Sequence, residues 1–112
     1  MNVFCKSMDS CTLVSIDGDI ISPEDEKVHN YLLRQIEEGN IELLVDLTAV
    51  KYIDSSGISM LLRLLQNARR KGGDIRIYGI SERVGKIFNQ VGLSHIFKSY
   101  KSQEEGIISF SG

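Results

Sequence analysis

The strongest apolar segment of the chain lies near its middle. Residues 41–47 are apolar except for Glu42 and Asp46. A run this continuous is typical of a strand covered on both faces, as in parallel α/β sheets. A short polar loop, Asp-Ser-Ser-Gly at residues 54–57, follows this strand. The pattern therefore predicts a central strand that ends in a polar turn.

Apolar residues recur at helical spacing directly after the loop and stop at Gly72-Gly73. Such spacing predicts an amphipathic helix, the longest of the chain. Leu61 and Leu62 are predicted core positions on it, whereas Arg63 lies on the polar side. The predicted inner face consists of Ile58, Leu61, Leu62, Leu65 and Ala68, widened by Met60 and Leu64.

A hairpin and a helix are predicted before the central strand. The hairpin has arms at 3–7 and 12–17, joined by turn residues Asp9-Ser10. Ser22 is suited to be an N-cap and Pro23 to be the first helical residue. The predicted helix ends at Gly39-Asn40, and its buried stripe consists of Val28, Tyr31, Leu32 and Ile36.

Strands and helices continue to alternate to the end of the chain. A strand is predicted at 74–80, then a helix capped by Ser81, then a short strand at 96–100. Ser102 and Glu105 form a capping-box pattern that starts a last helix. The inner face of the helix after Ser81 is predicted to be Val84, Ile87, Phe88 and Val91. This alternation predicts an α/β fold with a mixed, mostly parallel sheet, an N-terminal hairpin and about four packed helices.

Composition narrows the possible functions. The 112 residues carry a net charge of −2, and we expect one domain spanning 1–112 without a nucleic-acid surface. No apolar run reaches the roughly 20 residues of a membrane span, and the N-terminus lacks a signal-peptide pattern. We therefore expect a cytoplasmic protein. Cys5 and Cys11 show no metal or redox spacing, so free thiols are expected.

The sequence argues against an enzyme. A serine nucleophile needs a base within hydrogen-bond reach, and the two histidines, His29 and His95, are not predicted to lie near the polar loop. The loop lacks the G-x-S-x-G pattern of a nucleophile elbow, and no phosphate-binding loop occurs. The aspartates near residue 18 do not have the spacing of a calcium loop. We expect no catalytic activity, no metal and no cofactor.

The polar loop allows two interpretations. Asp and Ser before a helix are most often caps for unpaired N–H groups, and Gly57 would then serve only close packing. Alternatively, the loop is a functional site. Helical periodicity places Ser56 on the solvent side of the following helix, while Ser55 lies at the helix start, where that period does not fix the side-chain direction.

Three segments resemble the STAS domain family. They are D-L-T-A-V-x-Y-I-D-S-S-G-I at 46–58, G-G-D-I-R-I at 72–77 and V-x-K-I-F-N-Q-V-G-L at 84–93. The resemblance runs from about Val14 to the C-terminus. Within the family, the chain is most similar to the bacterial anti-sigma factor antagonists.

This resemblance implies a phosphorylation switch. In such antagonists the serine after the loop aspartate is the phosphorylation site, and that position is Ser55 here. The partner is an anti-sigma factor that is itself the serine kinase. The unphosphorylated antagonist binds it and releases the sigma factor, and the phosphorylated antagonist dissociates. The implied partner-binding residues are Asp19, Ile21, Ser22, Asp54, Ser55, Ser56, Gly57 and Ser59.

One position departs from the family pattern. The family usually has an aspartate three residues after the glycine that ends the second strand, and here Ile21 follows Gly18 at that spacing. The Asp54-Ser55 pair favours the antagonist. Ile21 favours the alternative of a STAS adaptor without a phospho-switch, in a lipid-transport ABC, stressosome-like or chemosensory complex.

Overall fold

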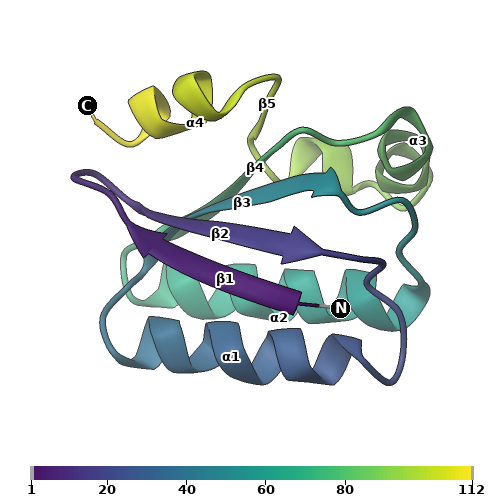
Figure 1. Ribbon diagram of the computed structural model, residues 1–112, viewed down its shortest axis with the longest axis horizontal. Helices are drawn as coiled ribbons and strands as arrows, with labels where there is room; N and C mark the ends of the chain where they lie inside the picture. The colour runs from purple at the N-terminus through teal and green to yellow at the C-terminus, as the bar shows by residue number, and fades with distance from the viewer. Residues whose placement is uncertain (1, 112) are drawn as a thin grey trace.

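The computed structural model describes residues 2–111, which form a five-stranded sheet in the order β1-β2-β3-β4-β5 (Figure 1). β1 (Asn2–Ser7) and β2 (Thr12–Asp17) form the antiparallel hairpin. β3 (Glu42–Ala49), β4 (Asp74–Tyr78) and β5 (Ser99–Tyr100) add to it in parallel. The predicted mixed, mostly parallel sheet is confirmed, with β3 in its centre.

Within residues 2–111, four α-helices pack around this sheet. α1 (Asp25–Glu37) and α2 (Ser55–Arg70) lie side by side on one face (Figure 1). α3 (Glu82–Gln90) lies at the end where the parallel strands terminate, followed by a 3₁₀ turn at Leu93–His95. α4 (Gln103–Ser109) covers part of the opposite face.

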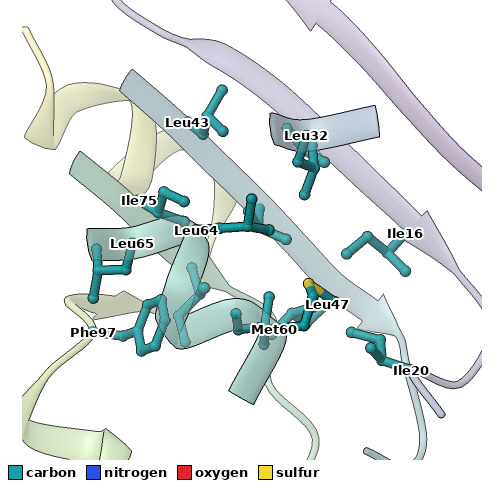
Figure 2. Close-up of a cluster of buried hydrophobic side chains, with 14 of the residues drawn as sticks. Ile16, Ile20, Leu32, Leu43, Leu47, Met60, Leu64, Leu65, Ile75 and Phe97 are labelled. Atoms are coloured by element: carbon teal, nitrogen blue, oxygen red, sulfur yellow. The ribbon is translucent and has the colours of Figure 1, made fainter. Parts of the chain in front are cut away.

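β3 is buried from both sides, as its continuous apolar pattern predicted. Leu43 and Leu47 point into the main core, which lies between the sheet and the helices α1 and α2, together with Ile16 and Met60 (Figure 2). Leu44 points the other way, into a smaller cluster under α4. A strand enclosed in this way can be apolar at successive positions, because neither face meets water.

The predicted start of α1 is wrong. The helix begins at Asp25, and Ser22 does not cap it. The backbone N–H of Asp25 donates to the Ile21 carbonyl at 2.9 Å, which closes a turn ahead of the helix. The Ser22 N–H donates instead to the Asp54 carboxylate at 2.9 Å. This bond ties Ser22 to the loop that precedes α2.

Several predicted burial patterns also need correction. The fully buried face of α2 is made by Met60, Leu61, Leu64, Leu65 and Ala68, while Ile58 and Leu62 are half-buried on its flank. Tyr31 is 36% exposed and Val91 50% exposed, so neither belongs to the core. The caps of α3 and α4 are confirmed, since Ser81 Oγ and Ser102 Oγ accept from the N–H groups three residues later.

The two cysteines are free, as expected from their spacing. Cys5 lies opposite Val14 in the hairpin register, so it does not face Cys11. Burial raises the pKa of both thiols, which keeps them in the unreactive protonated form near neutral pH.

Candidate functional site

Two loops and two helix starts meet at one end of the sheet. β2 and β3 run in parallel, and the chain leaves each of them at the same end to enter α1 and α2, respectively (Figure 1). Both helices therefore begin beside each other. In open α/β sheets this carboxyl end is where functional loops collect.

Backbone hydrogen bonds join the loop after β2 to the loop after β3. Ile20 forms an isolated parallel bridge with Ile53. The Ile20 N–H donates to the backbone carbonyl of Tyr52 at 3.1 Å, and the Asp54 N–H donates to the Ile20 carbonyl at 3.2 Å. These bonds extend the pairing of β2 and β3 up to Asp54, the residue before α2, so the backbone that leads into the two serines is held in place.

Asp54 is the N-cap of α2 and also binds the neighbouring loop. Its Oδ2 accepts from the Ser22 N–H, and its Oδ1 accepts from the Gly57 N–H, each at 2.9 Å. These N–H groups, first Ser22 and then Gly57, hold the pKa of the Asp54 carboxyl below its usual value. The capping interpretation of Asp54 is thus confirmed.

Asp19 and Ile21 occupy the loop after β2. Asp19 Oδ1 accepts from the N–H groups of Lys51 and Tyr52, each at 3.1 Å, so this carboxylate holds the opposite loop in place. Ile21 is half-buried, next to the fully buried Ile20. The loop therefore carries an apolar side chain at the position where the family pattern has an acid.

Gly57 is required by close packing. A Cβ at this position would lie 2.5 Å from the Ile20 carbonyl oxygen and 2.9 Å from side-chain carbons of Ile20 and Ile53. No side chain fits unless one of the two loops moves. The packing interpretation of this glycine is confirmed, and it explains how α2 can begin so close to the loop after β2.

The two adjacent serines have different surroundings. Ser55 is the first residue of α2, is exposed, and its hydroxyl makes no hydrogen bond within residues 2–111. Ser56 is exposed as well, but its Oγ donates to Asp25 Oδ2 at 2.6 Å. Ser59, one turn after Ser55, is also exposed. Residues four apart share a helix face, so Ser55 and Ser59 point out on the same side.

Sequence reasoning missed Asp25. Acidic residues in the first turn of a helix often do no more than complement the helix dipole. In the structure Asp25 is 6% exposed and reaches across to α2, while the neighbouring Glu26 is exposed. No local signal in the sequence separates these two acids, because the difference depends on where α2 lies.

A pocket of about 380 Å³ lies between the first turns of α1 and α2. Ser22, Asp25 and Ser56 line it, as do His29 and Arg63. His29 is thus nearer to the loop than expected, but it makes no hydrogen bond to a serine within residues 2–111. The described part of the chain contains no group of three His, Cys, Asp or Glu side chains arranged to hold a metal ion. It also contains no helix long and apolar enough to cross a membrane.

Comparisons with known proteins agree on one family. Residues 5–106 match the sequence model of the STAS domain. The anti-sigma-B factor antagonist of Listeria monocytogenes is 31% identical over 86 residues, which cover 76% of this chain and 75% of that protein. The matched residues 5–106 include the polar loop and both helices that border the pocket.

Solved structures show the same fold. A Thermotoga maritima protein assigned as an anti-sigma factor antagonist superimposes with a TM-score of 0.93 at 16% identity, over 98% of this chain and 95% of that one. The anti-sigma factor antagonist SpoIIAA in its unphosphorylated form superimposes with a TM-score of 0.74 at 16% identity, over 96% of each chain. The phosphorylated form of SpoIIAA from Bacillus gives 0.75 at 16% identity, over 96% of this chain and 98% of that one.

Proposed function

The chain belongs to the STAS domain family, and we propose that it is an anti-sigma factor antagonist whose binding is switched off by phosphorylation of Ser55. Its partner in this proposal is an anti-sigma factor that acts as a serine kinase and supplies ATP. The chain supplies the hydroxyl and a docking surface in the cytoplasm, and it catalyses nothing itself. The relative from Listeria and the phosphorylated Bacillus neighbour support this function.

The observation that carries the proposal is the position of Ser55. Its hydroxyl is exposed, forms no hydrogen bond within residues 2–111, and stands at the N-terminus of α2. A kinase can reach it without moving the backbone. The surrounding residues Asp19, Ile21, Ser22, Asp54, Ser56, Gly57 and Ser59 lie in the two joined loops or the first turns of α2, and we propose that they form the docking surface.

Electrostatics explains how a phosphate at Ser55 would release the partner. Phosphorylation adds about −1.5 to −2 charge and three acceptor oxygens. Within the domain this charge is tolerated, because free N–H groups and the helix dipole favour an anion at the start of a helix. At an interface the same hydrated dianion must lose water. Leaving a charge buried and unpaired there costs about 2–5 kcal/mol, and each 1.4 kcal/mol is about tenfold in affinity.

Ile21 supports one alternative, a STAS adaptor that docks without a phospho-switch. A half-buried isoleucine next to the serine loop offers apolar contact instead of a charge. An adaptor would bind its partner equally well before and after incubation with a kinase and ATP. The two proposals therefore differ in a measurable way.

The test needs the partner kinase, which we would seek among the products of genes that neighbour the gene for this chain. We expect that incubation with this kinase and ATP places one phosphate on Ser55, as mapped by mass spectrometry, and that binding to the kinase then weakens. Ser55→Ala should bind but resist release by ATP, while the matched variant Ser56→Ala should still be released. Phosphate on Ser56 alone would refute the site, and no phosphate on either serine would favour the adaptor.

A further inference from the structure

The chain presents two hydroxyls side by side at the start of one helix, and only one of them is free. Ser55 makes no hydrogen bond within residues 2–111, whereas Ser56 donates to Asp25 at 2.6 Å. Asp25 precedes Ser56 by 31 residues and comes from a different helix. A local capping preference cannot produce this contact, since it requires α1 and α2 to start side by side.

Asp25 is held firmly in this position. It is the first residue of α1, its N–H donates to the Ile21 carbonyl at 2.9 Å, and the residue is 6% exposed. The carboxylate of a residue this buried has little freedom to turn away. Its hydrogen bond to Ser56 is charge-assisted and at the short end for hydroxyl donors, which are the features of a strong bond.

We propose that Asp25 is a positioning residue that confines phosphorylation to Ser55 by engaging the hydroxyl of Ser56. This inference rests on the proposed function, because it concerns which of two serines the anti-sigma kinase modifies. It adds a residue outside the loop that determines the site of modification.

The reaction shows why the contact matters. The acceptor Oγ forms a bond to the γ-phosphorus of ATP, the bond from that phosphorus to the bridging oxygen of ADP breaks, and the hydroxyl proton leaves to a base of the kinase. At Ser56 the proton already points at Asp25, on the pocket side of α2. An ATP that approached Ser56 would have to bring its γ-phosphate next to this carboxylate.

The product is disfavoured in the same way. A phosphate on Ser56 would place about −1.5 to −2 charge beside the Asp25 carboxylate, and like charges at this range repel. Arg63 lines the same pocket and would attract that phosphate. Glu26 also lines the pocket, but it is exposed and makes no hydrogen bond to Ser56 within residues 2–111. Asp25 is the acid in direct contact with the Ser56 hydroxyl, so its removal should make Ser56 acceptable.

A purely structural role of Asp25 would be to hold α1 against α2. The choice of the kinase between Ser55 and Ser56 must therefore be measured separately from folding. The best background is Ser55→Ala, in which Ser56 is the acceptor that remains in the loop. In this background we expect Asp25→Ala to raise the phosphate found on Ser56 at least tenfold. Asp25→Asn keeps the shape and an acceptor oxygen but not the charge, so it should give an intermediate value.

The matched control is Glu26→Ala in the same Ser55→Ala background. Glu26 carries the same charge in the same turn of α1 and lines the same pocket, but it is exposed and makes no hydrogen bond to Ser56 within residues 2–111, so its removal should leave Ser56 unmodified. Thermal unfolding of each variant reports whether it is folded, and Asp25→Asn keeps the test decisive if Asp25→Ala unfolds.

The outcomes separate this inference from the proposed function. Phosphate on Ser55 in the wild type, with no gain at Ser56 in either Asp25 variant, overturns the role of Asp25 and leaves the phospho-switch intact. Phosphate on Ser56 in the wild type that disappears in Asp25→Ala would mean that Asp25 assists the transfer, which also overturns the inference. No phosphate on either serine in any variant removes the proposed function and the inference together.

Discussion

The backbone N–H of Ser22 donates to Oδ2 of Asp54 at 2.9 Å, across 32 residues of sequence. Through this bond the carboxylate that caps α2 also holds the loop after β2. The start of α2 and the loop after β2 are thus held together by one side chain. In the proposed function, a partner that docks on Ser55 would contact both segments. Removing the charge of Asp54 should therefore weaken two segments rather than one.

Asp54 should make the stability of the domain depend on pH in the acid range. Its folded-state pKa lies below the unfolded value of about 3.9, because the N–H groups of Ser22 and Gly57 favour the ionised form. Its contribution is therefore present above the unfolded pKa and is lost as the pH falls through the folded pKa. We expect the wild type to lose more free energy of unfolding than Asp54→Asn between pH 6 and pH 3, measured with urea.

The control for this profile is Asp9→Asn. Asp9 is exposed in the hairpin turn, and its carboxylate makes no hydrogen bond within residues 2–111. This variant should follow the wild-type profile. Parallel profiles for Asp54→Asn and the wild type would mean that the two backbone bonds to Asp54 do not stabilise the ionised form.

Gly57→Ala should destabilise the domain although it adds a good helix former. Alanine in place of a helical glycine normally gains about 0.5–1 kcal/mol. At Gly57 the added Cβ would lie 2.5 Å from the Ile20 carbonyl, and such overpacking typically costs about 1–3 kcal/mol. Urea unfolding should show a net loss of stability.

Gly85→Ala is the matched control within α3. Its Cβ would meet only a side-chain carbon of Ile80, at 3.7 Å, which is ordinary contact. The usual gain of about 0.5–1 kcal/mol should then appear. If both variants gained stability, the two loops would separate more easily than their hydrogen bonds indicate.

The sequence predicted those features that depend on short-range patterns. The covered strand β3, the caps at Ser81 and Ser102 and the polar turn at Asp54 each follow from a few neighbouring residues. The exposed position of Ser55 agrees with its place at the helix start, where periodicity no longer applies.

The features that were missed depend on contacts between distant segments. Ser22 looked like a helix cap, but its N–H is taken by a carboxylate from another loop. Asp25 was not singled out, because nothing near it in the sequence shows that α2 begins beside it and buries it. Both errors arise where α1 and α2 start side by side, so the places where local rules fail coincide with the candidate site.

The side of α2 that faces the core differs from the predicted one, and this changes which substitutions should lower the free energy of unfolding. Leu62 was predicted to be core, but it is half-buried, whereas Leu64 is fully buried under the sheet. Leu64→Ala should cost about 2–5 kcal/mol, the range for emptying a core position. Leu62→Ala should cost only about 1 kcal/mol, and the exposed Arg63→Ala should stay within about 0.5 kcal/mol. Equal losses for Leu62 and Leu64 in urea would contradict this orientation of α2.

A negative charge at Ser55 should release the partner without unfolding the domain. Ser55→Asp places one charge at the N-terminus of α2, where free N–H groups and the helix dipole favour an anion, so the free energy of unfolding should change by less than about 0.5 kcal/mol. At the interface the same carboxylate must be desolvated. Binding to the anti-sigma factor, measured by titration calorimetry, should weaken at least about tenfold, which corresponds to about 1.4 kcal/mol.

The control for net charge is Gln66→Glu, at an exposed position of α2 three turns away from the loop. It adds the same charge to the same helix and should leave binding unchanged. If both variants weakened binding equally, the effect would come from long-range repulsion, and it should then disappear at high salt. If Ser55→Asp bound as tightly as the wild type while its stability was unchanged, release by local charge would be refuted, and Ser55 would lie outside the contact surface.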